Sequence, residues 1–160
     1  MLRLSKLADY GTQVMTYMAR DQAVHSASEV AAELGIAAPT VSKILKMLVR
    51  KNLVASVMGA KGGYLLARLP SEISVAEIID AMDGPISITE CSGTTTCERE
   101  STCTTRSNWQ GINHIIQDAL EKVNLAEIAI ARISERGEER VFEVDLTEHG
   151  VLLAVGFIPG

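Results

Sequence analysis

Three cysteines are the residues of this chain best suited to metal chemistry. Cys91, Cys97 and Cys103 lie in one hydrophilic segment rich in threonine and glycine, with five residues between neighbours. No apolar periodicity surrounds them, so a role as small core side chains is disfavoured. Thiolates bind zinc and iron-sulfur clusters, and a loop can wrap around either. A 2Fe-2S or 4Fe-4S cluster would use all three thiols and would need one further ligand.

Other uses of the three thiols stay open on the residues alone. Structural zinc sites usually separate paired cysteines by about two to four residues, so this spacing fits zinc poorly. A structural disulfide leaves one thiol over and is disfavoured in the cytoplasm, whereas a redox switch is compatible with it. An oxidoreductase or sulfur-transfer enzyme needs an acid-base partner near a thiolate, and no Cys-His or paired-carboxylate pattern is evident. We therefore expect no enzymatic activity and no catalytic residues.

Length and composition indicate what kind of scaffold positions these cysteines. The chain has 160 residues, of which 47% are hydrophobic, 22% charged and only 4% aromatic. These values indicate one globular domain, or one such domain with an appended helical part, and a mainly helical core of aliphatic side chains. The sequence contains neither a secretory signal pattern nor an apolar run long enough to span a membrane. We expect a cytoplasmic protein that is not inserted in a membrane.

Charge is segregated along the chain. Residues 1–68 hold nine Lys or Arg against four Asp or Glu, a sum of +5, although the whole chain carries −5. Residues 38–68 contain no acidic residue and six basic ones, Lys43, Lys46, Arg50, Lys51, Lys61 and Arg68. Such a segment suits a polyanion, but a solvated helix face has the same composition.

The local pattern of this basic segment favours a helix-turn-helix. Ser26 and Glu29 form a capping box that begins a helix running to Leu34, and Gly35 ends it. Pro39 fits the first turn of a second helix, which has an apolar stripe on one side and hydroxyl and basic groups on the other. Two short helices joined by a turn containing glycine match the motif whose second helix enters the major groove of DNA.

A glycine-rich hairpin is predicted directly after the second helix. Residues 53–57 and 64–67 resemble strands, and the turn between them contains Gly59, Lys61 and Gly62. A tight hairpin turn explains the glycines equally well, but the succession of helix-turn-helix, basic face and hairpin favours a wing, with Lys61 in a minor groove. The predicted DNA-binding residues are Pro39, Thr40, Ser42, Lys43, Lys46, Gly59, Lys61 and Gly62.

Further helices are predicted on either side of the cysteines. Ser74 and Glu77 form a second capping box, which begins a helix that ends at Asp83. Beyond the cysteines, apolar residues recur every three or four positions, at Trp109, Ile112, Ile116, Ala119 and Val123. This seam, about two heptads long, suits either a partner helix or the core of the same chain. A homodimer on a palindromic operator would double the contact with double-stranded DNA.

These elements divide the chain into four predicted parts. We expect a winged helix-turn-helix domain over residues 1–85, a cysteine cluster-binding loop over 86–104 and dimerisation helices over 105–136. A helix is predicted over 124–134, capped by Asn124 and Glu127, and a strand over 141–146. Residues 137–160 form a C-terminal extension with no predicted role.

Several of these features together resemble a known family. Leu4 to Gly11, Thr40 to Lys43, Lys61 to Arg68 and the three cysteines resemble the Rrf-type winged-helix transcription regulators, which include IscR-like and NsrR-like proteins. The resemblance covers residues 1–130, and the sequences around Cys91 and Trp109 look most like the branch that regulates the SUF iron-sulfur assembly system. It implies a homodimeric repressor of iron-sulfur assembly genes, whose operator binding is switched by cluster occupancy or redox state.

The resemblance leaves the fourth cluster ligand open. The IscR-like pattern has a ligating histidine three residues after the last cysteine, where this chain has Arg106. NsrR-like members use an aspartate near the N-terminus of the opposite subunit, and the matching residue here is Asp9. We therefore predict Asp9 as the ligand, with Glu90, Glu98, Glu100 and His114 as rivals. A nitric oxide or redox sensor for other genes and a zinc-stabilised interaction module remain alternative functions.

Overall fold

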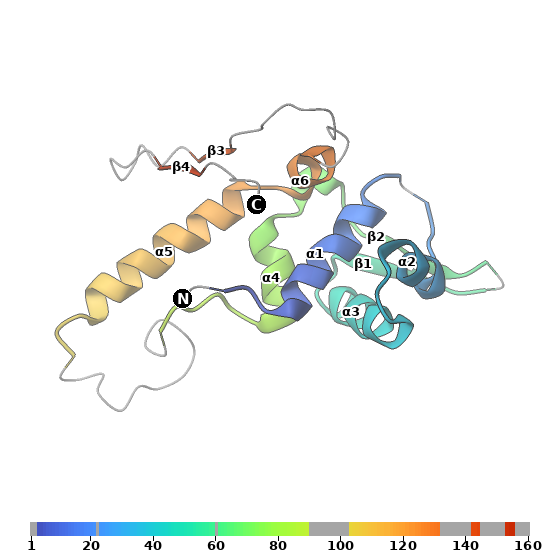
Figure 1. Ribbon diagram of the computed structural model, residues 1–160, viewed down its shortest axis with the longest axis horizontal. Helices are drawn as coiled ribbons and strands as arrows, with labels where there is room; N and C mark the ends of the chain where they lie inside the picture. The colour runs from blue at the N-terminus through green and yellow to red at the C-terminus, as the bar shows by residue number, and fades with distance from the viewer. Residues whose placement is uncertain are drawn as a thin grey trace.

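The computed structural model describes residues 3–21, 23–59, 61–89, 103–131, 142–144 and 153–155. The described part is mainly helical and contains two small antiparallel sheets, so the predicted winged-helix fold class is confirmed (Figure 1). The helices are α1 (Lys6–Met18), α2 (Ala27–Leu34), α3 (Ala38–Arg50), the short 3-10 helix η1 (Pro70–Glu72), α4 (Val75–Asp83), α5 (Arg106–Lys122) and α6 (Leu125–Ala131). The strands are β1 (Val54–Val57), β2 (Gly63–Leu66), β3 (Phe142–Val144) and β4 (Leu153–Val155).

Local sequence signals set the helix boundaries. The Ser26 hydroxyl accepts the Glu29 amide at 3.1 Å, and the Ser26 amide donates back to the Glu29 carboxylate, which completes the predicted capping box of α2. Gly35 ends α2 with φ +63°, a left-handed conformation that glycine adopts without steric cost. Ser74 and Glu77 cap α4 in the same reciprocal way. The helix-turn-helix is therefore built as predicted.

The core lies where α1, α3 and α4 meet. Met15 of α1, Ile44 and Leu48 of α3 and Ile78 of α4 are all 0% exposed. The apolar stripe of α3 thus faces inward, which directs its basic and hydroxyl-bearing side chains outward. Burial of one such aliphatic side chain contributes about 1.5–3 kcal/mol to stability.

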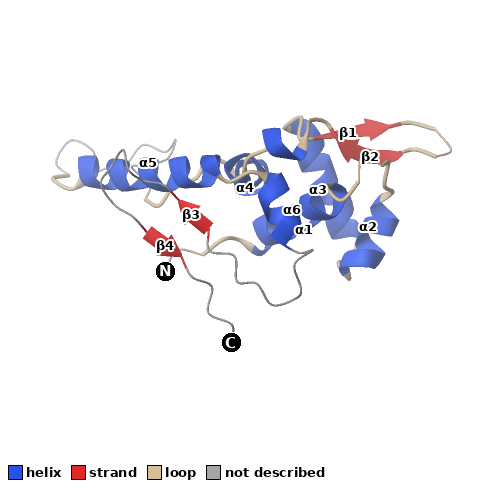
Figure 2. Ribbon diagram, turned by 90° about the horizontal axis from the view of Figure 1, so that it is seen from above, coloured by secondary structure: helices blue, strands red, loops and turns tan. Residues whose placement is uncertain are grey.

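The wing is a two-stranded hairpin that projects from one end of the molecule (Figure 2). Strands β1 and β2 pair in register from Val54 with Leu66 to Val57 with Gly63. Gly59 has φ +119°, so this turn position favours glycine. Gly62 is needed for a different reason, because a Cβ there would lie 2.5 Å from the Val57 carbonyl oxygen. Close packing within the hairpin therefore accounts for Gly62, in line with the tight hairpin turn that the sequence left open as an alternative.

Helix α5 extends toward the end opposite the wing (Figures 1 and 2). It ends at Lys122, so Val123, predicted as the last residue of the apolar seam, lies beyond the helix as its C-cap. The Val123 carbonyl instead accepts the Val75 amide at 2.9 Å, and the Leu125 amide donates to the Ile73 carbonyl at 2.8 Å. This backbone pairing ties the end of α5 to the start of α4.

Helix α6 packs on the winged domain. It contacts α1 and η1, and its first residue, Leu125, is fully buried in the common core. Asn124 and Glu127 cap it reciprocally, as predicted.

The predicted strand near residue 142 is β3, and it pairs with β4 farther along the chain. No helix in the described part of the chain is long and apolar enough to cross a membrane. The four domain boundaries stay predictions.

Candidate nucleic-acid interface

The outward face of α3 forms a basic surface with a shallow hollow. Its lining residues are Pro39, Ser42, Lys43, Lys46, Met47 and Arg50. Lys43, Lys46 and Arg50 are exposed and have no acidic partner among the described residues, so their charges are available to a polyanion. Of the other predicted DNA-binding residues on this helix, Pro39 is exposed, while Thr40 and Ser42 are half-buried. We call the six lining residues the α3 basic face.

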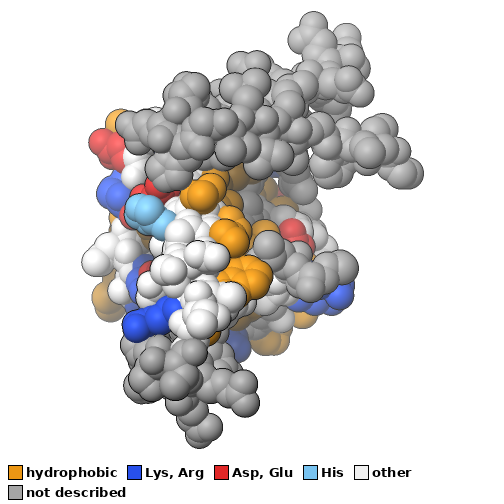
Figure 3. Space-filling view, turned by 90° about the vertical axis from the view of Figure 1, so that its left-hand side faces the viewer, with side chains coloured by type: hydrophobic (Ala, Val, Ile, Leu, Met, Phe, Trp, Pro, Cys, Tyr) orange, Lys and Arg blue, Asp and Glu red, His pale blue; other side chains and the backbone are white. Residues whose placement is uncertain are grey.

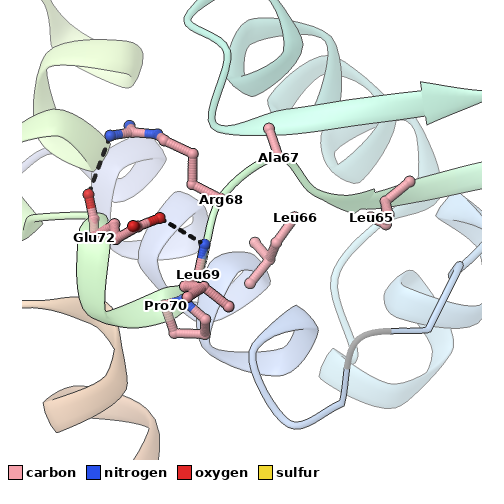
Figure 4. Close-up of a pocket in the computed structure, with 7 residues that line it drawn as sticks. All are labelled: Leu65, Leu66, Ala67, Arg68, Leu69, Pro70 and Glu72. Carbon is pink, nitrogen blue, oxygen red and sulfur yellow. Dashed lines mark hydrogen bonds between the residues drawn. The ribbon is translucent and has the colours of Figure 1, made fainter.

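Two other basic residues of the same segment are held by acidic partners on α4. The Lys51 ammonium lies 2.6 Å from an Asp80 carboxylate oxygen. The Arg68 guanidinium donates to Glu77 at 2.6 Å and to the Glu72 carbonyl at 3.0 Å, beside a small apolar pocket (Figure 4). The basic field predicted over residues 38–68 is therefore narrower than the sequence indicates, because α4 neutralises part of it.

Among the described residues at the tip of the wing, Lys61 carries a basic side chain and Met58 an apolar one. Gly59 and Lys61 are exposed and Gly62 is half-buried, so two of these three predicted residues are open to solvent. Met58 is 95% exposed, an extreme value for a large apolar side chain. Apolar side chains at such tips can wedge between base steps in a minor groove. The sequence patterns do not single out Met58, although its place in a glycine-rich turn is an available signal. The predicted contacts also omit Arg50.

Cys103 is the described member of the cysteine set and lies just before α5. Its thiol is half-exposed, and its sulfur lies 3.6 Å from the Thr105 hydroxyl oxygen. Hydrogen bonds from the Thr105 side chain and backbone, with the nearby Arg106, hold the pKa of the Cys103 thiol below its ordinary value. A lowered pKa favours the thiolate, which is the form that binds metals. Cys91 and Cys97 lie outside the described residues.

Asn113 anchors the chain on the other side of the cysteine segment. Its side chain is buried in α5, where it donates to the Ile86 carbonyl at 3.2 Å and accepts the Ile88 amide at 3.1 Å. Gln117 also donates to the Ile86 carbonyl, at 3.1 Å. The segment that leads toward Cys91 and the residues around Cys103 are thus attached to the same helix. No apolar periodicity points to this role of Asn113, so the role is not predictable from the sequence.

The other candidate ligands are distributed over separate elements. Asp9 is exposed on α1, and its carboxylate accepts the Gln13 amide at 3.1 Å. His114 is exposed on α5, 3.6 Å from Asp118. Glu90, Glu98 and Glu100 lie outside the described residues. Within the described ranges, no three or more His, Cys, Asp or Glu side chains are grouped so as to hold a metal ion.

The seam of α5 carries exposed apolar side chains. Trp109 is 40% exposed and Ile112 is 43% exposed, and they lie one turn apart on the helix. Ile116 and Ala119 of the same seam are half-buried. Figure 3 looks at the molecule from the side where α5 lies and shows hydrophobic side chains gathered in a column.

Comparison with known proteins identifies the family. The Rrf2 family model, described as an iron-dependent transcriptional regulator, matches residues 4–131. IscR from Serratia proteamaculans, an HTH-type transcriptional regulator, is 32% identical over 129 residues, which cover 77% of this chain and 78% of that protein. IscR from Pectobacterium atrosepticum is 31% identical over the same shares of the two chains.

Solved structures give the same assignment. The structure of CymR, the global cysteine regulator of B. subtilis, has a TM-score of 0.67 and 26% identity, covering 82% of this chain and 98% of that one. T. potens IscR has a TM-score of 0.65 and 27% identity, covering 86% of this chain and 93% of that one. These relatives are transcription regulators and not enzymes. The chain belongs to the Rrf2 family of winged-helix, DNA-binding transcription regulators.

Proposed function

We propose that this protein is an iron-sulfur cluster-dependent repressor of iron-sulfur (SUF) assembly genes. The observation that carries the proposal is the set of three cysteines between α4 and α5, within the span matched by a family described as iron-dependent. The chain binds double-stranded operator DNA through the α3 basic face, with Thr40 added, and through Gly59, Lys61 and Gly62 of the wing. It acts in the cytoplasm.

The chemistry of the donor set fits a cluster. Three thiols in one short segment supply soft ligands, and the lowered pKa of Cys103 favours its thiolate form. A bound cluster would make the site sensitive to iron supply and oxidation. Arg106 follows Cys103 by three residues and cannot ligate, so the fourth ligand comes from elsewhere. We assign it to Asp9 of a second copy of the chain, because this carboxylate is exposed on α1, where it accepts a hydrogen bond from the neutral Gln13 amide.

A homodimer formed through α5 completes the proposal. Of the seventeen residues of α5, only Asn113 is buried in the single chain, so apolar side chains of the seam keep part of their surface open to a partner. Trp109 and Ile112, near the start of α5, are the exposed members of the seam. Two copies related by a twofold axis would present two α3 helices to a palindromic operator.

Replacing Ile112 with glutamate should convert the dimer to a monomer without unfolding the chain. Ile112 is already 43% exposed, so the substitution costs little in the isolated subunit but places a charge in the proposed interface. Sedimentation equilibrium measures the expected loss of at least about tenfold in dimer affinity, equivalent to about 1.4 kcal/mol.

Gln110→Glu is the matched control for that substitution. Gln110 is exposed on the same helix outside the seam, so its variant should remain dimeric. A wild-type chain that sediments as a monomer, or equal dimer affinity in the two variants, would remove α5 from the proposed interface.

The proposed function is tested on protein purified without oxygen. Iron and sulfide counting with visible absorption should show a cluster, and binding to a duplex selected by the protein from genomic fragments should differ at least about tenfold with and without it. Equal affinity of the two forms would exclude a cluster-dependent switch. Asp9→Ala should make the cluster labile, and a normal cluster in that variant would exclude only the ligand assignment.

A further inference from the structure

His25 lies at a junction between the helix-turn-helix and the wing. It follows α1 and directly precedes Ser26, the N-cap of α2, and it is only 6% exposed. Its backbone amide donates to the Tyr64 carbonyl at 2.9 Å, and its carbonyl accepts the Tyr64 amide at 2.9 Å. His25 therefore adds a one-residue strand beside β2, which connects the wing directly to the start of α2.

The imidazole of His25 is held between two carboxylates. Its Nε2 atom lies 2.8 Å from Asp21 Oδ1, and its Nδ1 atom lies 2.9 Å from Glu29 Oε1. A carboxylate accepts hydrogen bonds, and a neutral imidazole has only one N–H to donate. Both contacts can be hydrogen bonds only when the ring carries two protons. The geometry therefore selects the imidazolium form.

Other described groups also contact His25 and its carboxylate partners. The Tyr17 ring meets the imidazole edge-on with centroids 5.1 Å apart, and its hydroxyl donates to Glu29 at 3.3 Å. The Arg20 guanidinium carbon lies 5.2 Å from the centroid of the Tyr17 ring, and β2 contacts His25 through the Tyr64 backbone. Burial lowers the pKa of His25, but hydrogen bonds to Glu29 and Asp21 and the charges of both carboxylates outweigh it and raise the pKa above 6.5.

The wing packs so closely against His25 that residue 63 has no space for a side chain. A Cβ on Gly63 would lie 2.5 Å from the His25 carbonyl oxygen and 2.9 Å from the Val24 side chain. Real Cβ atoms essentially never approach so closely, so residue 63 must be glycine for β2 to reach His25. Glu29 also caps α2, whereas Asp21 lies in the turn that follows α1, so the two carboxylates that hold His25 come from both sides of it in the chain.

We propose that His25 is a positioning residue that fixes the wing against the helix-turn-helix in its doubly protonated form, so that operator affinity falls as this proton is lost. The proposal rests on the DNA-binding role of the wing. The pKa of His25 is higher in the folded chain than in the unfolded chain, where it is about 6.5. The protonated ring therefore stabilises the junction fully when the pH is below the unfolded-state pKa, and this stabilisation is lost as the pH rises through the folded-state pKa. The wing is therefore held best in mildly acidic solution.

The first test measures the junction without DNA. Hydrogen exchange of the Tyr64 amide, expressed as a protection factor to remove its intrinsic pH dependence, is followed between about pH 5.5 and 8.5, a range that spans ordinary histidine titration. In the wild type, protection should fall about three- to fivefold as pH rises, the size expected for a partly exposed ion pair. In Asp21→Asn the fall should shift to lower pH, because the amide keeps the acceptor oxygen but lacks the charge.

Asp118→Asn is the matched control. Asp118 also lies four residues from a histidine, His114, which is exposed and remote from the wing, so this variant should follow the wild type. Affinity for the selected duplex at constant salt should change with pH in parallel with Tyr64 protection in all three proteins. His25→Gln should bind about three- to fivefold more weakly than the wild type at the lowest pH and show a flat profile.

The outcomes separate the two proposals. Normal DNA binding with pH-independent Tyr64 protection, or identical profiles for Asp21→Asn and Asp118→Asn, would overturn the role of His25 and leave the regulator function intact. Failure of the wild type to bind any duplex at every pH would overturn the DNA-binding role of the wing. If His25→Gln does not fold, Asp21→Asn still decides, because Asp21 is 59% exposed and its replacement leaves the capping box in place.

Discussion

Replacing Lys43 and Lys46 together with alanine should lower operator affinity about 60-fold at about 0.1 M salt. Each lysine that neutralises a DNA phosphate releases about 0.9 of a counterion, which contributes roughly eightfold in affinity at that salt concentration. The slope of log affinity against log salt should therefore become shallower by about 1.8. Fluorescence anisotropy of a labelled duplex over a salt series measures both quantities. Both side chains are exposed on the α3 basic face, so the fold should be unaffected.

Lys51→Ala is the control for that pair. Lys51 belongs to the same basic segment, but its ammonium is 2.6 Å from Asp80, so it should contribute little to binding. We expect less than about twofold loss of affinity and an unchanged salt slope. If Lys51→Ala weakens binding as strongly as the replacement of either α3 lysine, the proposed interface is wrong, because a lysine held by α4 would then be contacting DNA.

Substituting any one of Cys91, Cys97 and Cys103 with serine should abolish the visible chromophore and the switch. A serine hydroxyl is a hard, weakly acidic ligand, so it cannot replace a thiolate on iron. Bound iron should fall to background, and the affinity ratio between reconstituted and untreated protein should fall from at least about ten to about one. Anaerobic reconstitution followed by absorption spectroscopy and duplex binding measures both effects.

Thr104→Ala is the matched control beside the cysteines. Thr104 is exposed next to Cys103 and offers no thiol, so its variant should keep both cluster and switch. Serine variants that retain a full cluster would show that the three thiols are not its ligands. Serine variants that lose the cluster but keep a tenfold affinity ratio would show that binding responds to something other than the cluster.

Much of the winged domain follows from short sequence patterns. The capping boxes at Ser26 and Ser74 and the stop at Gly35 involve residues within a few positions of one another, so their geometry is fixed locally. The inward stripe of α3 is equally predictable, because one helical period relates its members. Asn52, at φ +56°, is a left-handed position that the same patterns did not reveal.

The candidate site depends more strongly on contacts distant in sequence. Six basic residues in one segment look equivalent, yet Lys51 meets Asp80 and Arg68 meets Glu77 on another helix. Val123 extends the periodicity of α5, but its backbone pairs with α4 and ends the helix. In both cases a partner far along the chain overrides a local pattern, and composition alone does not encode that partner.

The sequence by itself determined the family resemblance, the helix-turn-helix with its wing and the thiol set, since these follow from residue identity and short-range spacing. Only the tertiary structure decided which cations stay available for DNA, which glycines are required by packing and what His25 does. The physical reason is that these properties depend on distances between segments. Lys51 loses its availability because α4 is near, Gly63 must lack a side chain because the His25 carbonyl is near, and His25 is held as a cation because its ring lies between the Asp21 and Glu29 carboxylates.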